Sequence, residues 1–209
     1  MAEARIRGGL AGKILRVDLG SGKIWTEETA KYSEEWIGGR AVNSLILLNE
    51  LDRRVKWFDP ENLLIFGAGA LVGTPAPGAC RVSVETKNVF NDGKGSANVG
   101  GHLGPELKYA GFDHIAISGK SENPVYLFVS EGSAEIRDAR FVWRKTTFET
   151  EDILLLLLIE DLPDVVNLKF NAGDHCLLEG VHPAGRLLDL LASAAEVQFC
   201  VCRLKERPR

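Results

Sequence analysis

Two glycine-rich stretches of this sequence hold the residues best suited to bind a large anion. The first covers residues 73–81 and ends in Arg81, and the second covers residues 91–101 and contains Asn98. Glycine lets main-chain N–H groups approach a ligand closely, and the planar guanidinium of arginine donates several hydrogen bonds to phosphate. The pattern predicts two loops, on either side of one short strand, that together cradle a phosphorylated cofactor.

Other candidate motifs give weaker signals. Lys94 lies between glycines, but the Gly-x-x-x-x-Gly-Lys-Ser/Thr spacing of a nucleotide-binding loop is absent. His102 and His114 are interpreted as structural, and no residue is predicted to transfer protons in catalysis. Taken alone, Arg81 could equally form a surface ion pair, and Asn98 could be a turn residue that tolerates positive φ.

The cysteines show no metal-binding spacing. None of the four forms a Cys-x-x-Cys pair, and the closest two are separated by a single residue; the four are Cys80, Cys176, Cys200 and Cys202. Zinc and iron–sulfur sites need more regular clusters than this. We therefore expect ordinary thiols in a reducing cytoplasm, and the role of the last two stays open.

Composition restricts the class of protein. The chain has 209 residues, 45% hydrophobic and 26% charged, with a formal net charge of −4. No basic face is available for nucleic acid. The apolar run at residues 153–159 is far shorter than the roughly 20 residues that span a bilayer. We expect a cytoplasmic protein that binds neither nucleic acid nor membrane.

Periodicity predicts strands and helices without a regular βαβ alternation, which favours an α+β fold. A helix is predicted from an N-cap at Ser33 to Leu51, with Ala41, Leu45 and Leu48 on its apolar stripe. Strands are predicted at residues 13–19, 23–26, 63–66, 81–86, 114–118, 125–129, 134–137 and 165–170. Further helices are predicted at residues 104–110, with Pro105 first and Gly111 as the stop, from Thr146 onward, and at residues 187–191.

Six segments, taken together and in order, resemble the N-terminal domain of the tungsten-dependent aldehyde:ferredoxin oxidoreductase family. They are residues 12–19, 37–40, 60–66, 73–77, 106–113 and 145–151. The resemblance covers residues 10–152, which we expect to form a metallopterin-cradling domain. Residues 153–209 are expected to be a divergent leucine-rich segment packed on the same domain.

The resemblance implies a fold, a cofactor and its contacts. The fold would be a base of two mixed or antiparallel β-sheets with a few helices, carrying a tungsten or molybdenum bis-pterin. Arg81 would meet a pterin phosphate, and the backbone carbonyl of Asn98 would help hold a magnesium ion that bridges the two phosphates. Gly100 would be a neighbouring contact. Gly185 and Arg186 match a later phosphate-contacting segment, although leucines replace the glycines that follow it in the family.

The resemblance also implies a reaction, the oxidation of aldehydes to carboxylic acids. Electrons would pass through a [4Fe–4S] cluster to ferredoxin; a related subunit reduces aromatic thioesters. The cluster cysteines are missing from this sequence. We therefore expect part of an enzyme, inactive alone, which pairs with a subunit that supplies the missing domains or forms a homo-oligomer. The alternatives are a non-catalytic pterin-binding or subunit-pairing protein and a truncated gene remnant. The metal and the substrate stay open.

Overall fold

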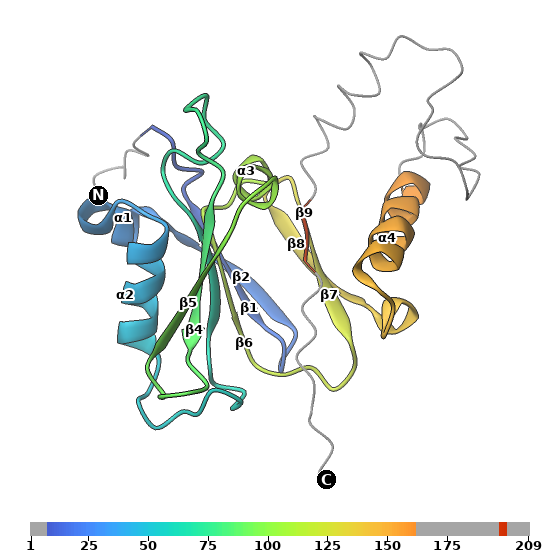
Figure 1. Ribbon diagram of the computed structural model, residues 1–209, viewed down its shortest axis with the longest axis horizontal. Helices are drawn as coiled ribbons and strands as arrows, with labels where there is room; N and C mark the ends of the chain where they lie inside the picture. The colour runs from blue at the N-terminus through green and yellow to red at the C-terminus, as the bar shows by residue number, and fades with distance from the viewer. Residues whose placement is uncertain (1–7, 162–196, 200–209) are drawn as a thin grey trace.

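The structure, a computed structural model, describes residues 8–161 and 197–199 (Figure 1). The helices are α1 (Ala30–Trp36), α2 (Arg40–Glu50), α3 (Leu103–Tyr109) and α4 (Thr147–Asp161), with a short 3₁₀ turn at Arg140–Val142. The strands are β1 (Lys13–Asp18), β2 (Lys23–Glu28), β3 (Leu64–Ala68), β4 (Val82–Lys87), β5 (Lys94–Val99), β6 (His114–Ser118), β7 (Val125–Ser130), β8 (Ser133–Asp138) and β9 (Val197–Phe199).

The strands form two sheets. The first has the order β2-β1-β6-β3-β4-β5, in which β1 and β6 are parallel and all other neighbours are antiparallel. Within the described residues the second sheet has the order β8-β7-β9 and is antiparallel. The expected α+β class with mixed and antiparallel sheets is confirmed.

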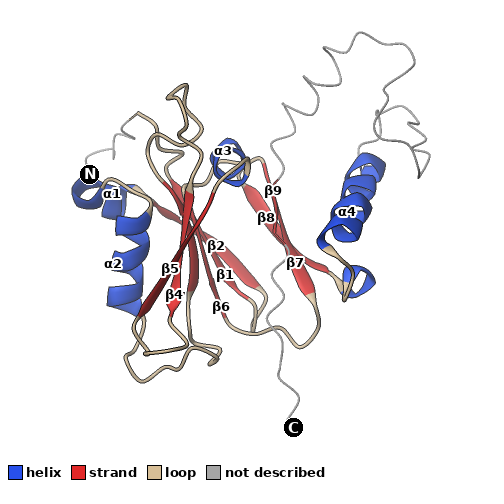
Figure 2. Cartoon of the chain, in the orientation of Figure 1, coloured by secondary structure: helices blue, strands red, loops and turns tan. Residues whose placement is uncertain are grey.

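Three clusters of buried side chains hold these elements in layers (Figure 2). Helix α2 packs on one face of the first sheet, where Val42 and Ile46 meet Ile65. The opposite face packs against α3 and the second sheet; Ile115 and Leu127 belong to that cluster. The outer face of the second sheet is covered by the 3₁₀ turn and α4, in a cluster whose buried members are Tyr126, Ala139, Val142 and Leu154. On its face of the first sheet, α2 lies over β3 and β4.

The single helix predicted from Ser33 to Leu51 is wrong, because two helices occupy that range. Helix α1 begins after Thr29, whose buried hydroxyl donates to Asp113, and Ser33 lies inside it. Gly38 and Gly39 then leave helical geometry with φ of 152° and 57°. A Cβ on Gly39 would lie 3.4 Å from the Cα of Gly69, so glycine permits a close backbone approach there.

The apolar stripe predicted for this range is only partly right, since Leu45 packs partly buried against the core cluster. The buried residues of α2 are Val42, Asn43, Ile46 and Leu47. Leu48, which the periodicity placed inside, is 74% exposed. A buried asparagine within the stripe disguised its true position, because an amide is not counted as apolar in a periodicity argument.

The second glycine-rich stretch is not a loop, which corrects the two-loop prediction. Residues 94–99 form β5, an edge strand paired along its whole length with β4. The irregular parts are the turn before it, closed by the N–H of Asn88 donating to the carbonyl of Gly93 over 2.7 Å, and Gly100 and Gly101 after it. Glycine lowers β propensity, but the ladder to β4 supplies the hydrogen bonds that propensity alone does not predict.

The remaining helix predictions hold in outline. Gly111 ends α3 with φ of 93°, as predicted, whereas Pro105 occupies its third position rather than its first. Thr146 caps α4: the N–H of Thr146 donates to the carboxylate of Glu149 over 2.8 Å, and the N–H of Glu149 donates to the hydroxyl of Thr146 over 3.3 Å.

Across residues 8–161 and 197–199, no helix combines the length and apolar character needed to cross a membrane. The segments predicted at residues 165–170 and 187–191 lie outside the described residues, as do three of the four cysteines.

Asp113 ties the start of β1 to the rest of the domain. Its buried carboxylate accepts hydrogen bonds from the N–H groups of Ala11 and Gly12, at 2.9 and 2.7 Å, and from the hydroxyl of Thr29 at 2.7 Å. It also forms an ion pair with the buried Lys108. Burial alone would raise the pKa of Asp113, but these donors and the lysine charge hold it below its usual value.

We expect Asp113→Asn to destabilise the fold by about 3 kcal/mol, because it leaves Lys108 buried without a counter-charge. The lowered pKa means that this stabilisation is present above the ordinary aspartate pKa of about 4 and is lost as the pH falls below it. Urea unfolding from pH 3 to pH 7 measures both effects. The control is Asp92→Asn, which breaks the exposed pair with Lys56 and should change little. Equal losses from the two variants would contradict this role.

Candidate functional site

The register of β4 against β5 brings the predicted site residues together. Ser83 pairs with Asn98 and Val82 with Val99, so Arg81 and Gly100 follow at the next position of the hairpin. Side chains two residues apart lie on the same face of a strand, which places Arg81 beside the Ser83–Asn98 pair. Arg81 at the end of the first glycine-rich stretch and Gly100 near the end of the second therefore meet at the open end of the hairpin.

These residues are open to a ligand. Arg81 is exposed and, within the described residues, forms no ion pair or side-chain hydrogen bond. Asn98 is also exposed, and its Oδ1 accepts a hydrogen bond from Ser83 over 3.2 Å. A Cβ added to Gly100 would meet nothing within 4 Å. As an edge strand, β5 also presents backbone groups on its outer side. The role of Arg81, Asn98 and Gly100 as cofactor contacts stays a prediction.

Helix α2 begins at the same end of the sheet. Ala68 at the end of β3 pairs with Val82 at the start of β4, and Gly39 at the start of α2 lies against Gly69. The helix therefore starts at the level of Arg81 and runs back over β3 and β4 (Figure 1). From the sequence, the two glycines of residues 37–40 predict a close approach of another backbone or of a ligand, which the contact with Gly69 confirms, whereas Arg40 is assigned no role in the site.

Beneath α2 lies a buried carboxylate that sequence reasoning missed. The side chain of Glu85 is fully buried, and its two oxygens accept from Ser96 over 2.9 Å and from Asn43. The guanidinium of Arg40 lies 3.6 Å away, from Nε to Oε1. Residues 40, 43, 85 and 96 come from three elements, so no local pattern could have found the group.

Asn43 extends this group to His114. Its Nδ2 donates to Glu85 and to the carbonyl of Ser83 over 3.0 Å, so its Oδ1 faces Nδ1 of His114 over 2.7 Å. The proton of the neutral imidazole therefore sits on Nδ1. Complete burial lowers the pKa of His114 to about 4, so the ring is uncharged near neutral pH. The structural role predicted for this histidine fits its location.

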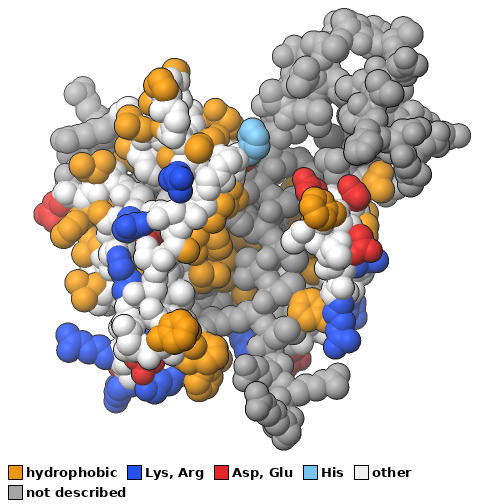
Figure 3. Space-filling view, in the orientation of Figure 1, with side chains coloured by type: hydrophobic (Ala, Val, Ile, Leu, Met, Phe, Trp, Pro, Cys, Tyr) orange, Lys and Arg blue, Asp and Glu red, His pale blue; other side chains and the backbone are white. Residues whose placement is uncertain are grey.

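The hairpin face is cationic although the chain is acidic overall. Alternation along the two strands and the ion pair at the start of α2 place on it one acid, Glu85, and the cations Arg40, Arg81, Lys87 and Lys94. Figure 3 shows lysine and arginine side chains gathered over the region of α2, β4 and β5. A local excess of positive charge attracts an anionic ligand to this face.

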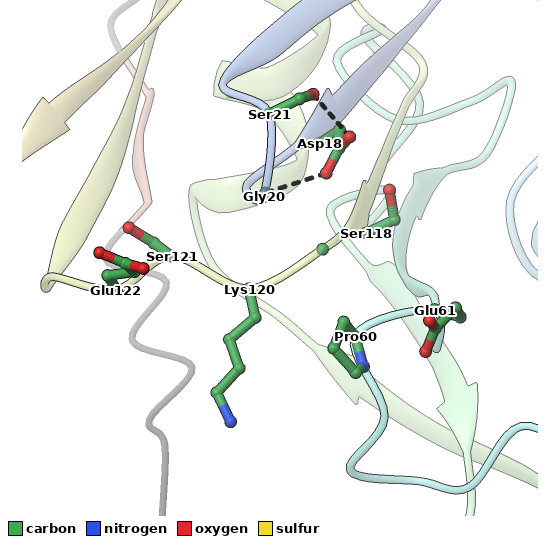
Figure 4. Close-up of a pocket in the computed structure, with 10 residues that line it drawn as sticks. Asp18, Gly20, Ser21, Pro60, Glu61, Ser118, Lys120, Ser121 and Glu122 are labelled. Atoms are coloured by element: carbon green, nitrogen blue, oxygen red, sulfur yellow. Dashed lines mark hydrogen bonds between the residues drawn. The ribbon is translucent and has the colours of Figure 1, made fainter.

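The opposite end of the sheet carries a pocket of the contrary charge. It has a volume of about 550 Å³ and lies where β1 and β6 end, lined by Asp18, Glu61, Lys120 and Glu122 among others. Figure 4 shows Asp18 turned toward Ser21, to which it is hydrogen bonded. Three carboxylates against one ammonium disfavour a phosphorylated ligand, so this pocket does not compete with the hairpin face.

Two predicted contacts are not described by the structure. Gly185 and Arg186 lie outside the described residues, so their prediction stays as it was. Among residues 8–161 and 197–199, no three histidine, cysteine, aspartate or glutamate side chains come together in a way that could hold a metal ion.

Comparison with known proteins identifies the family. Residues 14–159 match the profile described as "Aldehyde ferredoxin oxidoreductase, N-terminal domain". A tungsten-containing aldehyde ferredoxin oxidoreductase of Pyrococcus horikoshii is 41% identical over 180 residues, which is 85% of this chain. The chain belongs to the aldehyde ferredoxin oxidoreductase family, as its N-terminal domain.

Relatives with other activities share this domain. The WOR-like subunit of an aliphatic sulfonate oxidoreductase from Pyrococcus furiosus is 36% identical over 76% of this chain. The solved structure of the active-site complex BamBC of benzoyl coenzyme A reductase, with bound 1,5-dienoyl-CoA, aligns with a TM-score of 0.70 and 40% identity over 73% of the chain. The chain spans about a quarter of the length of these proteins, 27% for the P. horikoshii enzyme and 24% for the solved structure.

The buried polar group requires a glycine at position 67. A Cβ there would lie 2.3 Å from Oδ1 of Asn43 and 2.6 Å from Nδ1 of His114, both fixed by their hydrogen bonds. We expect Gly67→Ala to cost about 2 kcal/mol of stability, measured by urea unfolding.

Gly69→Ala is the matched control, because a Cβ at that position meets nothing within 4 Å. A Gly67→Ala protein as stable as the Gly69→Ala protein would show that the Asn43–His114 contact does not occupy this space.

Proposed function

We propose that this chain is the N-terminal cofactor-binding domain of a tungsten- or molybdenum-pterin oxidoreductase, and that the β4–β5 face holds the pterin phosphates. One observation carries the proposal. Arg81 is an exposed arginine without a protein partner among the described residues, beside Asn98 and Gly100 on a cationic face. An unpaired guanidinium next to open backbone suits a phosphate, which accepts several charge-assisted hydrogen bonds.

The residues present fit the cofactor that the family implies. Arg81 supplies counter-charge to one phosphate, and the edge strand β5 supplies backbone oxygens. A magnesium ion between two phosphates prefers such hard oxygen ligands, and the carbonyl of Asn98 is proposed as one of them. When bound, the metal–pterin group would supply the two-electron redox chemistry. This domain would bind and orient that group.

For the assembled enzyme we propose the oxidation of an aldehyde to a carboxylic acid, with electrons leaving through a [4Fe–4S] cluster to ferredoxin. The tungsten-containing aldehyde ferredoxin oxidoreductases support this, being 41% and 42% identical to the chain. The cluster ligands would come from a further domain or subunit. The similarity to the benzoyl coenzyme A reductase complex favours one second candidate, reduction of an aromatic thioester on the same cofactor.

The test is the amount of cofactor that the protein retains. The chain is produced, together with any complementing subunit, in cells that make the pterin and are supplied with tungstate. Tungsten is measured by mass spectrometry, and pterin by the fluorescence of its oxidised form, per polypeptide. We expect Arg81→Ala to lower both by about tenfold or more, because charge-assisted hydrogen bonds to the phosphate are lost.

Arg54→Ala serves as the control, since Arg54 is an exposed arginine paired with Asp52 beyond the far end of α2. It should retain cofactor as the unaltered protein does. Cofactor retained equally by both variants would refute the assignment of Arg81, and a protein that never retains pterin would refute the proposed function.

A further inference from the structure

We propose that Arg40 is a second phosphate-binding arginine of this face, oriented by the buried Glu85. The inference rests on the proposed function and extends it. Arg81 and Arg40 would each serve one phosphate of a ligand that carries two, with Asn98 between them.

The side chain of Arg40 is about half exposed to solvent. Its side chain is 51% exposed, whereas that of Glu85 is 0% exposed. The contact joins Nε of Arg40 to Oε1 of Glu85 at 3.6 Å, which is an ion pair without a hydrogen bond. Within the described residues, its terminal amino groups have no hydrogen-bond partner. These are the donors that form a bidentate pair with phosphate.

Glu85 is built to hold this arginine in place. Both of its oxygens are engaged by neutral donors, Ser96 on β5 and Asn43 on α2, so the carboxylate cannot turn away. A buried carboxylate is costly without a cation, and among the described residues Arg40 is the one cation within ion-pair distance of it. The position of the guanidinium is thereby fixed relative to both strands.

The strand register places Arg81 and Glu85, the carboxylate that holds Arg40, on either side of Asn98. Glu85 pairs with Ser96, and Ser83 pairs with Asn98. The second pair lies one two-residue repeat, about 7 Å, nearer the open end of the hairpin. Arg81 follows by another repeat on the same face. Arginine side chains are long enough to converge from both ends on the position opposite Asn98. This arrangement suits two neighbouring phosphates better than a single one.

A purely structural role, in which Arg40 does no more than neutralise Glu85, must be separated from phosphate binding. The variant Arg40→Gln with Glu85→Gln makes the distinction, because it keeps the net charge and leaves no buried carboxylate without a partner. If neutralisation is the whole role, this protein binds anions as the unaltered chain does. If Arg40 binds phosphate, affinity falls although the fold is retained.

The test uses inorganic pyrophosphate as the probe, titrated into the 209-residue chain at low ionic strength and followed by calorimetry. We expect affinity to fall about tenfold both in Arg40→Ala and in the double glutamine variant, the loss of a charge-assisted pair. Arg54→Ala, which removes a paired arginine elsewhere, should bind as the unaltered chain does. Circular dichroism checks that each variant is folded.

The outcomes distinguish the two proposals. Weakened binding in Arg81→Ala with normal binding in the double glutamine variant would overturn the role of Arg40 and leave the proposed function intact. Pyrophosphate binding that is absent from the unaltered chain, or equal in Arg81→Ala and Arg54→Ala, would overturn both. Weakened binding in both site variants, and not in Arg54→Ala, supports the two-arginine site.

Discussion

The antiparallel pairing of β4 with β5 is the constraint on which the candidate site depends. It sets Asn98 opposite Ser83 and brings Gly100 level with Arg81. A slip of one residue would turn the side chains of β5 to the opposite face, because the side-chain period of a strand is two. The cationic face would then lose Asn98 and Ser96 together. Register here is therefore a condition of the proposed ligand binding as well as of folding.

The polar group under α2, formed by Asn43, Glu85 and His114, holds the helix and the strands in one relative position. Asn43 reaches the carbonyl of Ser83, the carboxylate of Glu85 and the ring of His114, which belong to two different strands. Each of these hydrogen bonds requires its partner in place, so the group favours one arrangement of helix and sheet over others. Gly67 leaves the space that this arrangement needs. An apolar core would pack at this place with less geometric specificity.

Charge is distributed unevenly between the two ends of the first sheet. A chain with a net charge of −4 gathers basic side chains on the hairpin face, while the pocket at the other end of the sheet is acidic. The names of the relatives give different substrates, yet these proteins are 36–42% identical to this chain over the matched region. A domain shared across these relatives is what the proposed cofactor-holding role requires.

The sequence by itself determined strands β1 to β4 and β6 to β8, the α+β class, the family and the candidate residues Arg81 and Asn98, because strand alternation, glycine and arginine are recognisable locally. It misjudged residues 33–51 and 94–99, where Thr29 and the β4 ladder overrode local propensity. Only the tertiary structure decided that Arg40, Asn43, Glu85 and His114 form one group. Their contacts span up to 71 residues of chain, and such contacts arise from packing, which no short-range pattern encodes.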